Sequence, residues 1–381
     1  MKILLIASGY PTERYNLNGI FEFDQAKALV EAGHKVIYAA IDMRSVRRWR
    51  KWGYEGFVKE GVQVESINIP CGRIPNNILD KIKEFSLSRL YKRIESKYGK
   101  PDIIHSHFID MGFITAKLFK NSDIPLVHTE HYSGMNQEEI SEYYHYLGNN
   151  TYIYMDKTIA VSKYLADNIR NKFSVESIVI PNIVDTSSFQ YKTFYNNNNL
   201  FNFISVGNLL INKRMDLLIK SFHDAFKYNN EVKLYIYGEG SERKKIELLI
   251  VSLGLNNQVF LMGLVDRKVI ARKMQESHCF VLVSKLETFG VAYIEAMAAG
   301  LPVIATKCGG PENFINDSNG ILIPVDDQER LTKAMLEMYN NVNKYNKEAI
   351  SKETIEKFSS HNITKLLSKE YKRIIESKNI G

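Results

Sequence analysis

The stretch CFVLVSKLETFGVAYIEAMAAGLP, residues 279–302, predicts the architecture of the chain. Its first part, Cys279–Val283, is a short apolar run of the kind that forms a strand buried on both faces. Gly290 allows the backbone to turn tightly, and Val291–Ala299 then has the pattern of a helix that Gly300 ends. A buried strand followed by a turn and a helix is the repeating unit of an α/β protein with parallel strands.

The same alternation continues on both sides of this stretch, and it restarts near residue 203. We therefore predict two Rossmann-like domains, each a doubly wound parallel sheet, over residues 1–187 and 188–361. A C-terminal helix at about 362–381 is expected to pack back on the first domain. A run of four asparagines within 187–200 indicates an exposed loop beside the boundary. The predicted strands are Ile3–Ala7, Val36–Ile41, Asp102–His107, Pro125–Thr129, Thr158–Val161, Ser177–Ile180, Phe203–Val206, Lys233–Tyr237, Val259–Leu261, Cys279–Val283, Pro302–Ala305 and Gly320–Ile323.

Length and composition narrow the class of protein. The chain has 381 residues, of which 45% are hydrophobic and 24% charged, as in a globular protein of two domains. It has neither the run of about 18–20 apolar residues that crosses a membrane nor the apolar core of a signal peptide. Cys71, Cys279 and Cys308 lie far apart, which argues against a disulfide framework or a thiolate zinc site. We therefore expect a cytoplasmic protein.

Two parallel-sheet domains commonly bind a ligand in the cleft between them, outside the carboxyl ends of the strands. One class with this architecture is the nicotinamide-dependent dehydrogenases. Their G-x-G-x-x-G motif is missing after the first predicted strand, and the nearest match, Gly238-Glu-Gly240, has Arg243 in the place of the third glycine. The sequence therefore disfavours a dehydrogenase.

The loop and helix within 284–299 carry the residues with the clearest chemistry. The free N–H groups at the start of the helix after Gly290 suit a phosphate. Glu287 precedes the helix and could accept hydrogen bonds from a sugar, whereas Glu295, more than a turn into the helix, could accept them from a ribose. Two glutamates are a weak signal alone, because most glutamates are solvated surface residues. Their place in a strand–glycine–helix unit favours a binding site.

An ordered set of motifs resembles the retaining glycosyltransferases of family 4, whose fold is called GT-B. The resemblance centres on Glu287-x7-Glu295, with Phe289-Gly290 inside it, and runs from about residue 3 to about residue 372. The other matching segments are Asn18–Phe21, Thr129–His131, Ile180–Asp185, Gly207–Leu218, Tyr237–Gly240, Ala296–Ala305 and Gly309–Glu312. Two facing Rossmann-like domains with a deep cleft are the fold that this resemblance implies.

The resemblance also implies the reaction: a sugar moves from a nucleotide diphosphate sugar, by default a UDP-sugar, with retention and without a metal or cofactor. Residue by residue, Glu295 would bind the ribose, Glu287 the transferred sugar, and Lys213 the diphosphate. His131 would be the active-site histidine. A cation and preorganised donors would stabilise the charge that develops on the leaving diphosphate. The remaining donor-binding positions implied are Gly19, Asn208, Arg214, Gly238, Phe289, Gly290 and Val291.

One position departs from the family pattern. Many members have an arginine where this chain has Asn208, so that a lysine and an arginine together hold the two phosphates. An asparagine donates hydrogen bonds but carries no charge. Arg214, next to Lys213, is the candidate for supplying the missing charge, although its side chain could equally point outward. The sequence leaves both alternatives open.

The sequence around three further polar residues predicts a role for each. His105 and His107 are two residues apart on a predicted strand and so share one face of the sheet. No third metal ligand is evident nearby, and we expect packing or acceptor contact from this pair. Ser162 follows the strand Thr158–Val161 and is predicted to cap the next helix.

Basic residues are concentrated in the first third of the chain. Residues 1–120 hold 20 Lys and Arg against 13 Asp and Glu, whereas the remainder is balanced at 30 of each. The segment Arg44–Trp52 contains five basic residues and both tryptophans. It is either a solvated loop or a surface that meets an anionic membrane, with the indole rings at headgroup depth. The residues predicted for that surface are Arg47, Arg48, Trp49, Arg50, Lys51 and Trp52.

A second segment, Lys81–Ile94, mixes apolar and basic residues in a helical pattern. In GT-B enzymes the amino-terminal domain usually carries the acceptor site. We therefore expect a glycan or lipid-linked glycan acceptor and a cytoplasmic enzyme that is peripheral on the inner face of the membrane. No nucleic-acid recognition module is evident, so nucleic acid is not an expected partner.

Two other functions remain open from the sequence. A nucleotide-sugar epimerase could use the same fold, but it needs acid and base carboxylates that the sequence does not place. A non-catalytic subunit that binds a sugar nucleotide would fit the missing arginine at position 208.

Overall fold

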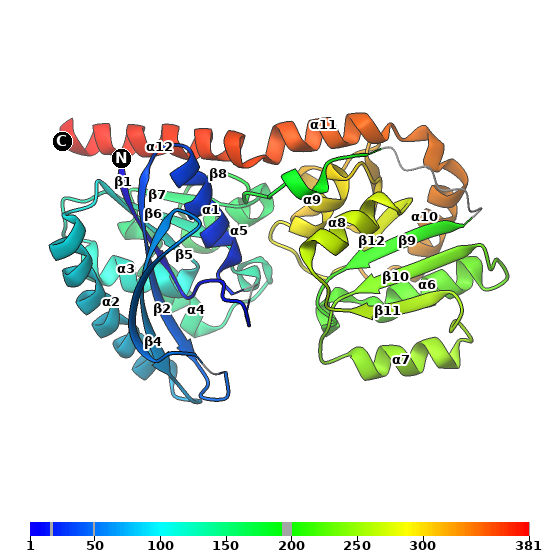
Figure 1. Cartoon of the computed structure of the whole chain (residues 1–381), viewed down its shortest axis with the longest axis horizontal. Coiled ribbons are helices and arrows are strands. Elements are labelled where there is room, and N and C mark those ends of the chain that lie inside the picture. The colour runs from blue at the N-terminus through cyan, green and yellow to red at the C-terminus, as the bar shows by residue number, and fades with distance from the viewer. Residues whose placement is uncertain (16–17, 49, 193–199, 381) are drawn as a thin grey trace. The chain divides into compact units, whose positions relative to one another are not determined.

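The computed structural model describes residues 1–15, 18–48, 50–192 and 200–380, which form two compact units (Figure 1). Unit 1 contains Met1–Ile183 and the chain from Ser360 onward, and unit 2 contains Val184–Ser359. Each unit is an α/β structure around a sheet of mostly or wholly parallel strands. The predicted fold class of two Rossmann-like parallel sheets is thus confirmed.

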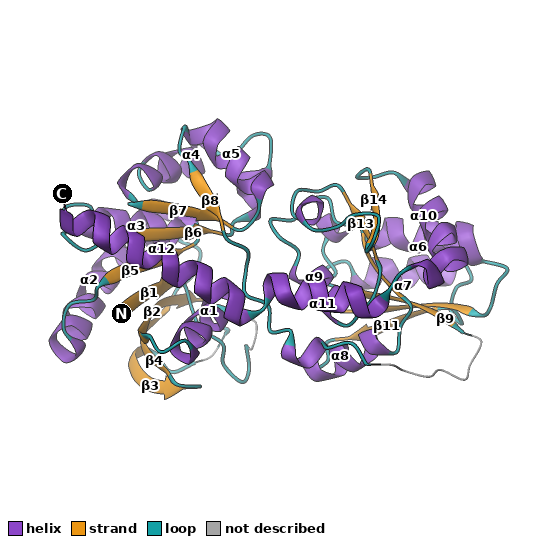
Figure 2. Cartoon of the chain, turned by 90° about the horizontal axis from the view of Figure 1, so that it is seen from above, coloured by secondary structure: helices purple, strands orange, loops and turns teal. Residues whose placement is uncertain are grey.

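The sheet of unit 1 has the order β3-β4-β2-β1-β5-β6-β7-β8, which can be followed strand by strand in Figure 2. All neighbouring strands are parallel except β3 and β4, which form an antiparallel edge. From β1 the chain builds the sheet first toward β2 and later toward β5. The strands are β1 Lys2–Ala7, β2 Lys35–Arg44, β3 Gly53–Lys59, β4 Val62–Pro70, β5 Ile103–His107, β6 Leu126–Glu130, β7 Lys157–Ala160 and β8 Ser177–Val179.

Helices cover this sheet because each presents an apolar stripe to it. Ser162 accepts a hydrogen bond from the backbone N–H of Leu165 at 3.2 Å, so its predicted role as the cap of α5 is confirmed. Of the described helices, none combines the length and the apolarity that crossing a bilayer requires. The helices of unit 1 are α1 Ile20–Glu31, α2 Asn76–Tyr98, α3 Ile109–Phe119, α4 Glu142–Asn149, α5 Lys163–Phe173 and α12 Ser360–Ile380.

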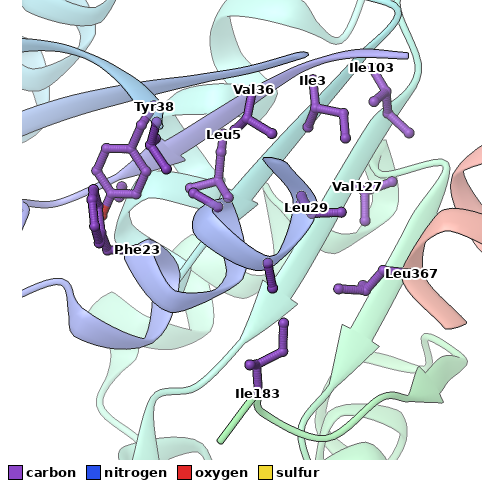
Figure 3. Packing of buried hydrophobic residues seen from close by; sticks show 14 of the residues in the cluster. Ile3, Leu5, Phe23, Leu29, Val36, Tyr38, Ile103, Val127, Ile183 and Leu367 are labelled. Atoms are coloured by element: carbon purple, nitrogen blue, oxygen red, sulfur yellow. The ribbon is translucent and has the colours of Figure 1, made fainter. Parts of the chain in front are cut away.

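The core of unit 1 contains residues from both ends of the chain (Figure 3). Side chains alternate between the two faces along a strand, so Ile3 and Leu5 of β1 point to the same face of the sheet, where Leu29 of α1 packs on them. Leu367 of α12 belongs to the same buried cluster. The last helix is therefore an integral part of unit 1.

Unit 2 has a six-stranded parallel sheet with the order β11-β10-β9-β12-β13-β14. From β9 the chain runs outward through β10 and β11, and it then crosses back to β12 on the other side. The strands are β9 Phe201–Val206, β10 Val232–Tyr237, β11 Val259–Gly263, β12 Cys279–Leu282, β13 Val303–Thr306 and β14 Gly320–Ile323. The helices are α6 Met215–Phe226, α7 Arg243–Ser252, α8 Arg267–Gln275, α9 Val291–Ala298, α10 Gln328–Asn341 and α11 Lys347–Phe358.

Two features of unit 1 were not predicted. The hairpin of β3 and β4 adds an antiparallel edge to the sheet, although Val62–Pro70 shows partial alternation of apolar residues. The strand β2 extends to Arg44, three residues beyond the predicted end. As a result, the start of the basic segment Arg44–Trp52 lies in a buried strand instead of a loop.

Candidate active site

In unit 2 the candidate residues gather where the strand order reverses. β9 and β12 are neighbours, but the chain leaves them in opposite directions across the sheet. Ligands of open α/β sheets bind outside the carboxyl ends of the strands at such a switch point. The loop after β9 carries Asn208, Lys213 and Arg214, and the loop after β12 carries Glu287 and Gly290.

Two glycines allow the loops after β9 and β10 to touch through their backbones. A Cβ atom on Gly238 would lie 2.0 Å from the carbonyl oxygen of Gly207, and the φ of Gly238 is 142°. A Cβ on Gly240 would lie 2.2 Å from the carbonyl oxygen of Leu209. At position 238 only glycine tolerates both the positive φ and the close approach to the Gly207 oxygen. The close contact fixes the backbone around Asn208 against the second loop.

Lys213 and Glu287 meet across the switch point. The ammonium group of Lys213 forms an ion pair with the Glu287 carboxylate, and both side chains are largely buried. The hydroxyl of Ser284 donates to the same carboxylate at 2.7 Å. The backbone of Glu287 is itself held, because its N–H donates to Cys308 and its carbonyl accepts from Gly310, each at 3.0 Å. The structure thus brings together two residues that the sequence placed in one site.

Arg214 is held by carboxylates. Its guanidinium bonds Asp216 at 3.1 Å and also forms an ion pair with Asp326. The ammonium group of Lys285 pairs with the other oxygen of Asp326 at 3.0 Å. Asp326 therefore gathers two cations beside Lys213. Neither Asp326 nor Lys285 was identified from the sequence, because the pattern of residues around each is that of an ordinary surface loop.

The helix α9 starts directly at the switch point. Gly290 is its N-cap residue with a φ of 95°, and Val291 is its first residue. Phe289 is buried, and a Cβ on Gly310 would come within 2.3 Å of its carbonyl oxygen. The start of α9 therefore offers the positive end of the helix dipole and the backbone N–H groups of its first turn, of which that of Tyr293 donates to the Gly290 carbonyl at 3.1 Å.

Glu295 lies in α9 and is buried, with 9% of its surface exposed. Burial raises the pKa of this carboxyl, and the nearby Arg267 opposes that effect. Arg267 donates to one oxygen of Glu295 from Nε at 2.8 Å and from Nη2 at 2.6 Å. The guanidinium also lies over the ring of Phe189, 5.3 Å from its centre. The sequence did not single out Arg267, since a basic residue at the start of a helix gives no such signal.

In unit 1 the histidines lie at the carboxyl ends of β5 and β6. Nδ1 of His107 and Nε2 of His131 are 2.9 Å apart, and the rings of His105 and His107 stack at 4.4 Å. The predicted shared face of His105 and His107 is thus confirmed, and the Gln25 amide lies within 3.3 Å of both rings. Burial lowers the pKa of His131 to about 4, and the Glu130 carboxylate only partly offsets this. His131 is therefore neutral at physiological pH.

Gly19 and Glu22 mark the start of α1. Gly19 is the N-cap residue with a φ of 66°, and a Cβ on it would lie 2.4 Å from the carbonyl oxygen of Gly9. Glu22 is almost fully buried, and its Oε1 atom has no hydrogen-bond partner among the described residues. Burial raises the pKa of Glu22 to about 7, with a further contribution from Asp110. Nothing in the sequence distinguishes Glu22 from an ordinary glutamate of a first helical turn.

The structure corrects part of the prediction for the basic segment Arg44–Trp52. Arg47, Arg48 and Lys51 are exposed, as predicted for a surface. Arg50 is instead buried, forms an ion pair with Asp42, and lies over a tyrosine ring, so its prediction as a surface residue is wrong. The buried Asp42 carboxylate of β2 holds the guanidinium of Arg50 together with that of Arg44, which bonds both of its oxygens at 2.8 Å. Trp52 is partly exposed, and Trp49 lies outside the described residues.

Comparisons with known proteins place both units in one family. The family model "Glycosyl transferases group 1" matches residues 190–354, and "Glycosyltransferase Family 4" matches residues 23–188. An uncharacterized glycosyltransferase of Methanocaldococcus jannaschii is 30% identical over 247 residues, which are 63% of this chain and 66% of that protein. The alpha-monoglucosyldiacylglycerol synthase of Acholeplasma laidlawii is 27% identical over 312 residues, with coverages of 72% and 75%. The chain thus spans just under two thirds of the first relative's length.

Solved structures share the fold. A sucrose-phosphate synthase from Thermosynechococcus elongatus superimposes with a TM-score of 0.81 at 20% identity, over 99% of this chain and 100% of the other. Anabaena HepE in complex with UDP gives a TM-score of 0.75 at 16% identity, over 98% and 99%. The predicted two-domain Rossmann-like GT-B fold is therefore confirmed.

Proposed function

Because this chain belongs to the group 1, family 4 glycosyltransferases, we propose that it transfers a sugar from a UDP-sugar to a hydroxyl of a glycan or lipid-linked glycan, with retention and without a metal. The observation that carries this proposal is the Lys213–Glu287 ion pair at the β9/β12 switch point, beside the start of α9. UDP is favoured as the carrier because structurally similar HepE binds it.

In this proposal the diphosphate takes the place of Glu287 as the partner of Lys213. The ammonium group then neutralises the charge that develops on the leaving group, and the first N–H groups of α9 add donors. Glu287 is freed to accept hydrogen bonds from the sugar hydroxyls. Its hydrogen bond from Ser284 and its two backbone bonds keep the carboxylate in place during this exchange.

The same proposal gives Glu295 and His131 separate tasks. Glu295 accepts hydrogen bonds from the ribose hydroxyls, for which it must be ionised. His131 is neutral, so it serves as a hydrogen-bonding group near the reacting sugar and not as a general acid. Retention without a protein nucleophile then requires attack from the face of the departing diphosphate, whose oxygen takes the acceptor's proton.

We further propose that the exposed residues Arg47, Arg48 and Lys51 meet an anionic membrane, where a lipid-linked acceptor resides. The relative from Acholeplasma laidlawii is named as a synthase of a glycolipid, which supports a membrane-borne acceptor. Each basic residue near such a surface contributes about 1 kcal/mol. Co-sedimentation with anionic vesicles should fall when Arg47 and Arg48 are changed to Ser, and equal binding to neutral vesicles would refute the proposal.

The donor assignment is tested by slow UDP-sugar hydrolysis, followed by NMR without an acceptor. Lys213→Ala and Glu287→Gln should each slow hydrolysis by about 100-fold or more, as expected for loss of a preorganised charge stabiliser. Lys244→Ala, which removes an exposed lysine of the same unit, is the matched control and should change nothing. Wild-type rates in the first two variants would refute the site, an isomerised sugar would indicate an epimerase, and no turnover with intact binding would indicate a non-catalytic subunit.

A further inference from the structure

Unit 1 contains a pocket of about 170 Å³ that no step of the proposed donor chemistry uses. It lies between α2, the start of α3, the segment after β6, and α4. The residue after His131, Tyr132, is part of its wall, and the ring of Phe108 is 4.9 Å from the imidazole of His131. The pocket therefore adjoins the histidine assigned to the reacting sugar.

One side of the pocket is aromatic. The rings of Tyr132 and Tyr144 stack at 4.5 Å, and the ring of Tyr143 meets that of Tyr144 edge-on at 5.4 Å. Phe108 joins them with a φ of 62°, a conformation that a bulky residue adopts only where the surroundings enforce it. Such strain is characteristic of residues held in place for a ligand.

The other side of the pocket is polar and carries one more negative charge than positive. Asp80 is buried and accepts from the Tyr143 hydroxyl, with both oxygens at 3.0 Å. Lys83 is paired with Asp110 at 2.7 Å. Burial raises the pKa of Asp80, and the hydrogen bond from Tyr143 and the charges of Lys83 and Lys117 only partly oppose this effect. An anionic ligand would meet no uncompensated positive charge among these residues.

We propose that this pocket binds a neutral pyranose ring of the acceptor. Aromatic walls suit the C–H face of a sugar ring, and the carboxylates of Asp80 and Asp110 accept hydrogen bonds from its hydroxyls. The excess negative charge excludes a phosphate-bearing ring, so the acceptor residue held here is uncharged. This inference rests on the proposed glycosyl transfer and names the chemical class of its acceptor.

The test is a titration of the full chain with methyl β-D-glucopyranoside, methyl β-D-galactopyranoside and glucose 1-phosphate, observed by saturation-transfer NMR. We expect millimolar binding of at least one neutral glycoside and weaker binding of the phosphate. Tyr144→Ala and Asp80→Asn should each weaken the glycoside by at least 10-fold, whereas Tyr144→Phe retains it. Tyr146→Ala, on the same helix but outside the pocket and 54% exposed, is the control and should bind normally.

Donor hydrolysis separates failure of this inference from failure of the proposed function. Because Lys213, Glu287 and Glu295, assigned to the diphosphate, the sugar and the ribose, all lie in unit 2, the pocket variants should retain UDP binding and donor hydrolysis. Unchanged glycoside affinity in Tyr144→Ala, tighter binding of glucose 1-phosphate that Tyr144→Ala weakens, or no glycoside binding to the wild type would each overturn the pocket assignment. A different outcome is possible, in which the wild type hydrolyses no donor but binds the glycoside, and the pocket variants lose that binding. This outcome would support the pocket and refute the proposed reaction. Thermal melting of each variant verifies that it is folded.

Discussion

A buried ionisable side chain makes the stability of a protein depend on pH, and Glu22 is a clear case in this chain. Its pKa is about 7 in the folded chain, against 4.5 as the ordinary value. The folded state therefore holds the proton more tightly, and stability falls as the pH rises from 4.5 to 7. At 1.4 kcal/mol per pKa unit, the cost at pH 8 is on the order of 3 kcal/mol.

Glu22→Gln should remove this cost. We expect the variant to be more stable than the wild type at pH 8 by about 2–3 kcal/mol and to match it at pH 4.5. Urea unfolding at the two pH values measures the difference. Glu31→Gln, at an exposed position of the same helix, is the control. A stability gain that is equal at both pH values would show that ionisation of Glu22 is not its cause.

Arg267 and Glu295 make a second prediction about ionisation. Burial raises the pKa of Glu295, and Arg267 limits that rise through two hydrogen bonds to one carboxylate oxygen. Arg267→Gln should raise the pKa of Glu295 further. As the pH is lowered, Glu295 is then protonated earlier, and UDP affinity begins to fall at a higher pH than in the wild type. Calorimetric titration with UDP from pH 5 to 8 detects this shift.

The control for that experiment is Lys268→Ala, which removes the same charge at the next, exposed position. Its affinity should follow the wild-type pH profile. A loss of affinity in Arg267→Gln that is the same at every pH would mean that Arg267 contacts the nucleotide directly and does not act through Glu295.

The residues of the candidate site differ in how well the sequence predicts them. Lys213 and Glu287 are found from a motif, because each has a fixed position relative to a glycine or a helix start. Arg267 and Lys285 are missed because their roles come from carboxylates far along the chain, at Glu295 and Asp326. Arg50 is misassigned although its partner Asp42 is only 8 residues away, because it is the sheet that buries Asp42 and not the neighbours of Asp42 in sequence.

Among the elements, the glycine loops after β9 and β10 give a sharp test of backbone packing. Gly238→Ala would place a Cβ 2.0 Å from a backbone oxygen at a φ of 142°. We expect a loss of stability well above the ~1–3 kcal/mol of a strained backbone alone, together with loss of UDP binding. Chemical denaturation and UDP titration measure the two effects.

Gly254→Ala is the matched control, because Gly254 has a φ of 69° and open space around its Cβ position. It should cost only about 1–2 kcal/mol and leave UDP binding intact. Similar losses in both variants would mean that conformation alone, and not the contact with Gly207, requires glycine at position 238.

Most elements could be predicted, because buried parallel strands read as short apolar runs between helical patterns. The hairpin β3–β4 could not, since an edge strand such as β3 alternates exposed and half-buried residues and carries charges. In β4 the buried Glu65 interrupts the apolar pattern, and its partners Tyr54, Lys97 and Tyr98 come from β3 and α2. Tertiary contacts thus override the local pattern at the edge of the sheet.

Unit 1 is built from two separate segments of the chain, because α12 returns to it after unit 2 is complete. Ile363, Leu367, Tyr371 and Ile374 follow a helical spacing, and all four are buried in the core of unit 1. Burial of each such side chain contributes about 1.5–3 kcal/mol, so these four supply on the order of 6–12 kcal/mol. That is as large as the net stability of a typical domain.

Ending the chain at Ser359 should therefore unfold unit 1 and leave unit 2 intact. We expect the truncated protein to lose one of two thermal transitions while the transition that UDP raises is retained, because Lys213, Glu287 and Glu295 all lie within 184–359. Adding residues 360–381 as a separate peptide should restore the lost transition, because unit 1 can fold around the added helix and bury its apolar side chains. Replacing Leu367 and Tyr371 by Ser in that peptide should abolish the restoration, whereas replacing the exposed Lys365 and Lys369 should not. Retention of both transitions in the truncated chain would mean that strands β1–β8 with α1–α5 fold without the helix that fills their core.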